Sequence, residues 1–144
     1  MAKLTNKVAV ITGGSGAIGS TTAKLFLSEG AKVVLVDINK EALDKVASDL
    51  NSPNLSYIVA DVTKAADVQK YVQHTVDTFG KIDVFFNNAG IEGVVKPIEE
   101  FPEEVFDKVM AVNVKGAWLG LKYVLPQMND GGSIINASSV AGLS

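Results

Sequence analysis

A cluster of glycines between two apolar patterns is the first feature of this sequence that could do chemistry. The segment Thr12–Gly19, TGGSGAIG, follows a continuous apolar run and precedes a stretch with helical spacing. Glycine allows a tight turn and a close approach to a pyrophosphate, and the next helix offers its N-terminal N–H groups to phosphates. A tight strand–helix turn without a ligand can have the same composition. The residues of this segment that we single out for dinucleotide binding are Gly13, Gly14, Ser15, Gly16, Ile18 and Gly19.

Asp37 makes this interpretation more specific. It ends the second apolar run, 18 residues after Gly19, and an acidic residue at an offset of about 20 binds the adenosine ribose of a dinucleotide. Taken alone, Asp37 could equally cap the next helix. Together with the glycines it predicts a dinucleotide site, which would also include the adjacent Ile38.

The same carboxylate bears on the choice of cofactor. It would repel the 2′-phosphate of NADP, which is usually paired with Arg or Lys. All 13 basic residues are Lys, and the nearest, Lys40, lies at the start of the next predicted helix. We therefore expect NAD as the cofactor and NADP as the less favoured one.

Strands and helices alternate along the chain and must position these residues. Strands are predicted at 8–11, 33–36, 55–59, 83–86 and 133–135, and helices at 17–28, 41–50, 65–79, 103–112 and 114–128. This alternation predicts a parallel sheet covered on both faces, in one dinucleotide-binding domain over 1–144. We expect a doubly wound α/β fold of the Rossmann type, with strand order 3-2-1-4-5 and the cofactor at the carboxyl ends of the strands.

Composition excludes several other classes of protein. The 144 residues are 47% hydrophobic with a net charge of −3, which argues against disorder and against a nucleic-acid partner. No apolar run is long enough for a membrane span, and the first residues carry no signal-like apolar segment. The absence of Cys is consistent with a cytoplasmic location. With one His, His74, expected at the surface, we predict no metal site.

The segment 87–90, NNAG, directly follows the fourth predicted strand, and here the chain resembles the compact, single-domain branch of the short-chain dehydrogenase/reductases. That branch carries TGxxxGxG at the first turn, NNAG after strand four, a helical Asn as in 112–116 (VNVKG) and a Ser as in 135–139 (INASS), which occur here in this order. The first pattern would place Gly at Ala17, so the glycines also fit TGxxGxxG of the extended branch of sugar-nucleotide epimerases and dehydratases. NNAG and the context of Asn113 favour the compact branch.

The resemblance implies cofactor contacts at two further loops. Asp61 and Val62, at the end of the third predicted strand, would border the adenine ring. Asn88, Ala89 and Gly90 would line the cofactor cleft.

The resemblance also implies two catalytic residues. Ser139 would hydrogen-bond the reacting oxygen of the substrate, although Ser138 has the same chemistry and only the family's register selects Ser139. Asn113 would hold a water in a proton relay, and its place between two predicted helices also suits an ordinary helix cap.

The family's acid–base pair, YxxxK, does not occur in these 144 residues. Its Tyr, with an ordinary pKa near ~10, has to be shifted to act close to neutral pH, but no Lys stands four residues after Tyr57, Tyr71 or Tyr123. We expect this chain alone to be inactive and further polypeptide to carry the pair.

The implied parent reaction is the NAD-dependent interconversion of a secondary alcohol and a ketone. The alternative is a non-catalytic nucleotide-binding or regulatory module. A methyl-donor site would use similar glycines but gives no reason for NNAG or Asn113.

The predicted helix 114–128 is apolar on every side, with charges at Lys115 and Lys122 alone. The sheet covers one face, so we expect the other, with Trp118, to meet a second copy in a homodimer or homotetramer, as is common in the family. The predicted strand 133–135 would be an apolar sheet edge that invites pairing with other polypeptide.

Overall fold

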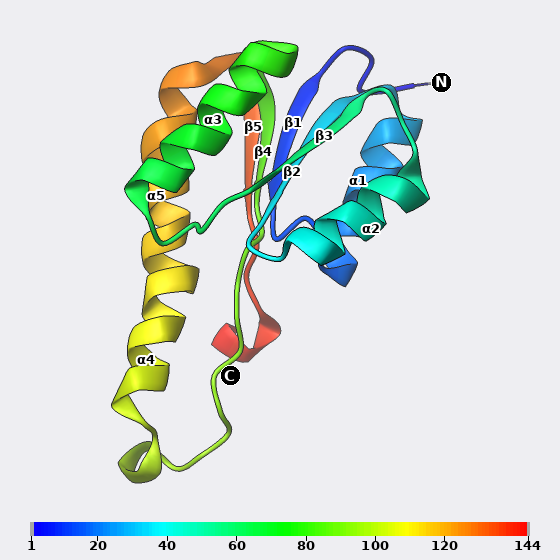
Figure 1. Cartoon of the computed structure of the whole chain (residues 1–144). Coiled ribbons are helices and arrows are strands. Elements are labelled where there is room, and N and C mark those ends of the chain that lie inside the picture. The colour runs from blue at the N-terminus through cyan, green and yellow to red at the C-terminus, as the bar shows by residue number, and fades with distance from the viewer. Residues whose placement is uncertain (1, 144) are drawn as a thin grey trace.

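The computed structural model describes residues 2–143, which form a parallel sheet with helices on both faces (Figure 1). The strands lie in the order β3-β2-β1-β4-β5, and the predicted doubly wound topology is confirmed. Their bounds are β1 Val8–Thr12, β2 Lys32–Asp37, β3 Leu55–Val59, β4 Ile82–Asn87 and β5 Met128–Asn136.

Helices α1 and α2 lie on one side of the sheet, while α3 and α5 lie on the other and α4 projects below it (Figure 1). Their bounds are α1 Ala17–Ser28, α2 Lys40–Leu50, α3 Ala65–Phe79, α4 Glu103–Met110 and α5 Ala117–Val124. A π-helical segment, η2 Ala111–Gly116, joins α4 to α5, and the 3₁₀ turns are η1 Ile98–Glu100, η3 Leu125–Gln127 and η4 Val140–Leu143.

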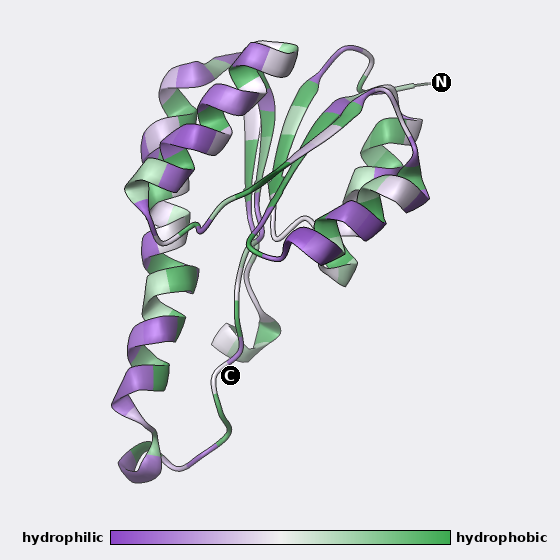
Figure 2. Cartoon of the chain, viewed as in Figure 1, coloured by the Kyte–Doolittle hydropathy of each residue, from purple (hydrophilic) through white to green (hydrophobic). Residues whose placement is uncertain are grey.

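The sheet divides the interior into two cores because alternate side chains of a strand face opposite sides. Val34 and Val36 lie in the core beneath α3 and α5, with Tyr71 of α3. Val33 and Leu35 lie in the core beneath α1 and α2. Both sets are fully buried, which explains the continuous apolar runs of β1 and β2 (Figure 2).

The second half of the chain departs from the sequence prediction in three places. The helices predicted at 103–112 and 114–128 form one rod interrupted by the π-helical segment η2. The rod's α-helix ends at Val124, because Pro126 lies in the next turn and cannot donate a helical hydrogen bond. β5 begins at Met128, five residues earlier than predicted, and reaches its regular register with β4 across a bulge that contains Gly131 at φ 78°.

Only one face of α5 is buried in this chain. Leu119 and Val124 pack in the core, whereas Trp118 is 56% exposed and Val114, in η2, is 53% exposed. The sequence prediction that apolar residues surround this helix is therefore right, but the sheet covers only its inner face.

Candidate functional site

A cavity of about 650 Å³ opens at the carboxyl ends of the strands, within the usual size range of a small-molecule site. Its walls come from the glycine turn after β1, the end of β2, the loops after β3 and β4, and the α4–η2 rod. The predicted residues that line it are Gly13, Ser15, Gly16, Ile18, Asp37, Ile38, Asp61, Val62, Asn88, Ala89 and Gly90.

Two predicted glycines, Gly14 and Gly19, do not line the cavity but make the turn possible. A Cβ on Gly14 would lie 2.8 Å from the Cβ of Leu35, and a Cβ on Gly19 would overlap the carbonyl oxygen of Gly13. Gly13 itself has φ 64°, in the left-handed region that favours glycine. No side chain caps the start of α1, so its N-terminal N–H groups and partial positive charge are suited to a phosphate at the cavity.

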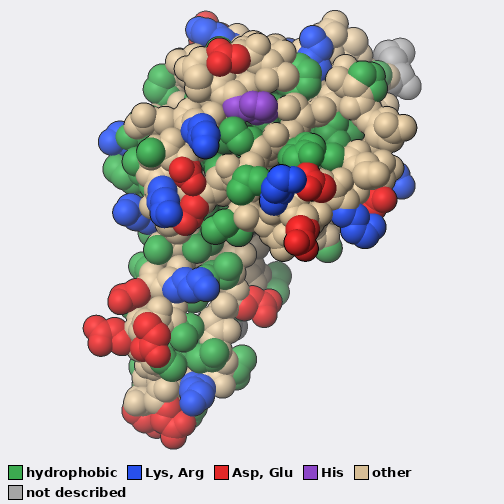
Figure 3. Space-filling view, in the orientation of Figure 1, with side chains coloured by type: hydrophobic (Ala, Val, Ile, Leu, Met, Phe, Trp, Pro, Cys, Tyr) green, Lys and Arg blue, Asp and Glu red, His purple; other side chains and the backbone are tan. Residues whose placement is uncertain are grey.

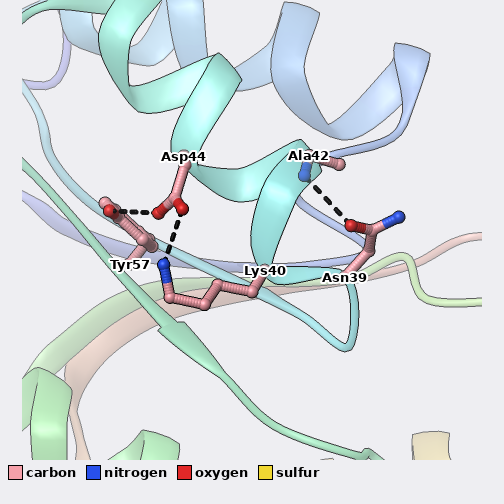
Figure 4. Close-up of polar contacts among 5 residues, drawn as sticks. All are labelled: Asn39, Lys40, Ala42, Asp44 and Tyr57. Carbon is pink, nitrogen blue, oxygen red and sulfur yellow. Dashed lines mark hydrogen bonds and ion pairs between the residues drawn. The ribbon is translucent and has the colours of Figure 1, made fainter.

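The Asp37 carboxylate connects the glycine turn to the loop after β2. Its Oδ2 accepts hydrogen bonds from the backbone N–H and the hydroxyl of Ser15, at 3.1 and 2.6 Å. Its Oδ1 accepts the N–H groups of Ile38 and Asn39, at 2.8 and 3.3 Å. The cap of α2 is Asn39, which accepts the N–H of Ala42, so Asp37 is not the helix cap (Figure 4).

Asp61 lies in the loop after β3 rather than at the end of the strand. Its Oδ1 accepts the hydroxyl and the N–H of Thr63, at 2.6 and 2.9 Å. The hydrogen bond from the Thr63 hydroxyl holds the pKa of Asp61 below its ordinary value, so this wall of the cavity carries a negative charge at neutral pH. The next residue, Val62, packs against Gly116 of η2, where a Cβ would lie 2.8 Å from Val62 Cγ2.

The NNAG segment holds β4 to its neighbours. The hydroxyl of Thr12, at the end of β1, accepts the N–H groups of Asn88 and Ala89, both at 3.0 Å. Asn87 donates to the carbonyl of Ala117 at 3.0 Å and to the side chain of Asn136 at 3.2 Å. The segment therefore connects β1, β4, α5 and β5 at the edge of the cavity.

Asn113 lies inside the π-helical segment rather than at a helix end. Its side-chain oxygen accepts the N–H of Ile91 at 2.8 Å, and its nitrogen donates to the Ile91 carbonyl at 2.9 Å. Gly90 makes room for this contact, because a Cβ there would lie 3.3 Å from Asn113 Oδ1. The helix-cap interpretation is therefore wrong, and the π-helical turn, a feature frequent at functional sites, presents this side chain to the loop after β4.

Ser139 is not brought to the cavity. Its hydroxyl accepts the N–H of Ala141 at 3.2 Å, and both it and Ser138 are exposed beyond β5. Asn113 does not line the cavity either, although its partner Ile91 does.

Other residues of the cavity were missed by sequence reasoning. Ala17, Val36, Asn39, Ala60 and Ile91 are sequence neighbours of predicted residues, so widening each motif by one position would have included them. Lys108 and Val112 also line the cavity. They lie four residues apart on the α4–η2 rod; Val112 is the neighbour of the predicted Asn113, whereas no sequence signal relates Lys108 to the glycine turn.

His74 lies at the surface, where it is half-buried, and its Nε2 lies 2.8 Å from the hydroxyl of Ser56 on β3 (Figure 3). Within residues 2–143 no group of three His, Cys, Asp or Glu side chains could hold a metal ion. None of the described helices is long and apolar enough to cross a membrane.

Comparison with known proteins agrees with the fold. The short chain dehydrogenase family model matches residues 7–144. Levodione reductase of Leifsonia aquatica is 44% identical over 147 residues, which cover 98% of this chain and 55% of that protein. The chain therefore belongs to the short-chain dehydrogenase family, as the motifs predicted, and it spans about half the length of the curated relatives it matches.

Solved structures give the same result. The crystal structure of levodione reductase superposes with a TM-score of 0.94 at 40% identity, over 99% of this chain and 57% of that one. NAD⁺-bound xylitol dehydrogenase gives 0.92 at 38% identity, over 99% and 56%. A 3-ketoacyl-(acyl-carrier-protein) reductase from Brucella melitensis, complexed with NADH, gives 0.83 at 38% identity, over 87% and 51%.

Proposed function

We propose that this chain forms the cofactor-binding part of an oxidoreductase that uses NAD in preference to NADP to interconvert a secondary alcohol and a ketone. The observation that carries the proposal is the Asp37 carboxylate, which lies in the wall of the cavity beside the glycine turn and the uncapped start of α1. A carboxylate beside a phosphate site suits a ribose with free hydroxyls, which donate hydrogen bonds to it.

The cavity would hold the adenosine and pyrophosphate groups of such a cofactor. Asp37 already accepts four hydrogen bonds, about the number that a carboxylate can take. A ribose diol would therefore replace the Ser15 hydroxyl at Oδ2 instead of adding to it. The backbone of the glycine turn and the first N–H groups of α1 would hold the pyrophosphate.

The charges around the cavity favour NAD. Asp37 and Asp61 are acidic, and Lys108 is the one basic side chain among the described residues that line the cavity. Lys108 comes from α4, which continues the rod of α5 below the sheet, away from α2 (Figure 1). One structural relative was solved with NADH bound and another with NAD⁺ bound, which supports a nicotinamide cofactor.

The catalytic part of the proposal assigns a role to Ser139 and Asn113. When bound, the nicotinamide ring would take up or supply the hydride. Ser139 would donate a hydrogen bond to the substrate oxygen where charge develops. Asn113, whose amide is bound to Ile91, would position the loop beside the cavity, and any water relay would be built on that fixed segment.

We also propose that the exposed face of the α4–η2–α5 rod is covered by a second copy of the chain. Large apolar side chains recur along it at near-helical spacing, interspersed with acidic groups on the projecting α4 (Figure 3). They are Phe106, Met110, Val114, Trp118 and Leu125, each at least 41% exposed. A stripe of this kind is typical of an interface.

The function is tested by following NAD⁺ reduction with a panel of secondary alcohols, and NADH oxidation with the matching ketones, in the full-length protein. We expect turnover with at least one pair and weaker turnover with the phosphorylated cofactors. NAD binding without turnover on any substrate would support the non-catalytic alternative.

A further inference from the structure

Lys40, Asp44 and Tyr57 form a polar group that we call the α2–β3 cluster (Figure 4). Lys40 Nζ lies 2.6 Å from Asp44 Oδ2, and the Tyr57 hydroxyl donates to Asp44 Oδ1 at 2.7 Å. Tyr57 belongs to the edge strand β3, so the cluster joins α2 to the sheet. Both oxygens of Asp44 are thus used to hold one cation and one phenol.

The cluster stands next to the part of the cavity that Asp37 defines. Asn39 lines the cavity and its N–H reaches the Asp37 carboxylate, and Lys40 is the next residue, with its Cα about 3.8 Å further along the chain. A lysine side chain is long enough to reach back over that distance. Figure 4 shows it extending the other way, along α2 toward Asp44 and Tyr57, with Asn39 on the opposite side of the helix start.

We propose that Asp44 determines cofactor specificity by holding Lys40, the cation closest in sequence to Asp37, away from the position of a 2′-phosphate. The proposal rests on the proposed function, because it concerns the same adenosine end of the cavity. Asp37 repels the extra phosphate directly, and the α2–β3 cluster withholds the nearest group that could neutralise it.

Two features favour this role over a purely structural one. The hydrogen bond from Lys40 lowers the pKa of Asp44, and the hydrogen bond to Asp44 raises the pKa of Lys40, so both stay charged at neutral pH. Tyr57 fixes the carboxylate in place by a bond that does not depend on Lys40. Exposed ion pairs between a lysine and a carboxylate are otherwise weak, so the lysine easily leaves its carboxylate for another anion.

The helix also contains a matched control. Lys45 and Asp49 form the same type of i,i+4 pair at 2.8 Å, one turn or more further from the cavity. Asp49→Asn removes the same charge from the same helix without releasing Lys40. Asp44→Asn removes the charge that binds Lys40 while keeping an oxygen that can accept the Tyr57 hydroxyl.

The experiment measures dissociation constants of NAD⁺ and NADP⁺ by calorimetry, which needs no turnover. Adding Asp44→Asn to Asp37→Ala should tighten NADP⁺ binding about three- to fivefold, the size expected of one exposed charge pair, and leave NAD⁺ binding unchanged. Adding Asp49→Asn should change neither. A further Lys40→Gln should abolish the gain in the Asp44→Asn background, yet have no effect on NADP⁺ binding where Asp44 is intact.

The proposal is overturned if Asp44→Asn gives no more NADP⁺ affinity than Asp49→Asn, or if the gain survives Lys40→Gln. A loss of NADP⁺ affinity on Lys40→Gln with Asp44 intact also overturns it, because Lys40 would then reach the phosphate already. These results leave the proposed function standing as long as the unsubstituted protein binds NAD⁺. If it binds neither cofactor, both proposals fail together.

Discussion

Two regions of the molecule differ in how firmly the chain holds its own functional groups. One is the cofactor side, which comprises β1, β2 and the loops after them, and the other is the exposed side, which comprises β5 and the turn after it. β1 and β2 are buried along most of their length, and Thr12 and Asp37 at their ends each accept several hydrogen bonds from neighbouring loops. β5, at one edge, is mostly exposed, and Ser139 beyond it accepts hydrogen bonds from Ala141 and Gly142 in its own turn. Contacts within the chain therefore organise the cofactor side, whereas they do not bring the Ser assigned to catalysis to the cavity.

The largest expected effect is on the free energy of unfolding, when a buried isoleucine of the cofactor side is shortened to alanine. The same substitution on the exposed side serves as the comparison. Ile11 in β1 is fully buried, while Ile135 in β5 is 45% exposed. Ile11→Ala should lower the free energy of unfolding by about 2–5 kcal/mol, and Ile135→Ala by about 1 kcal/mol or less. Denaturant unfolding of the two variants measures the difference. Equal losses of unfolding free energy would contradict the claim that the cofactor side is held more firmly than the exposed side.

The second prediction tests whether Ser139, in the turn after β5, takes part in catalysis. In the full-length enzyme, Ser139→Ala should reduce kcat by about 10²–10³, the usual cost of losing a donor to developing negative charge. Ser138→Ala should have a much smaller effect, and neither should change NAD⁺ affinity. A larger loss at Ser138 would show that the register of the family motif has been placed wrongly by one residue.

The third prediction concerns the turn on the cofactor side. Gly19→Ala places a Cβ against the Gly13 carbonyl, whereas Gly16→Ala leaves 3.4 Å to the same oxygen. Overpacking of this kind costs about 1–3 kcal/mol, so Gly19→Ala should lower the unfolding free energy by that amount and Gly16→Ala by clearly less. The comparison fails if Gly16→Ala proves as costly.

The smallest effect, of opposite sign, is expected in the core beneath α3 and α5. The Tyr71 hydroxyl is buried without a hydrogen-bond partner among the described residues, and burial raises the pKa of this phenol. Tyr71→Phe should leave the unfolding free energy unchanged or raise it by up to about 1 kcal/mol. Tyr57→Phe, which removes a paired hydroxyl, should lower it instead. A clear loss at Tyr71 would mean that its hydroxyl is satisfied in solution.

Local patterns predicted the cofactor side well. Apolar runs and turn residues gave the strands and helices, and the spacing of Asp37 from the glycines gave part of the cavity wall, because these features depend on residues close in sequence. The strand order followed from the general topology of doubly wound folds, which the structure confirms. The contact of Asn113 with Ile91, 22 residues away, and the entry of Lys108 into the cavity depend on how a helical rod packs against distant segments, which no local period encodes.

One other difference arises from a single residue. The sequence pattern carried the helix through Pro126, although that residue lacks the N–H that a helix interior needs. Trp118 lies on an apolar helix, and periodicity cannot tell whether the sheet or another molecule covers a given face.

The central claim is that Asp37 makes this cavity a site for NAD rather than NADP, and equilibrium binding tests it most directly. The unsubstituted protein should bind NAD⁺ at least about tenfold more tightly than NADP⁺, and Asp37→Ala should narrow that ratio by relieving charge repulsion. Equal or tighter binding of NADP⁺ by the unsubstituted protein would contradict the claim.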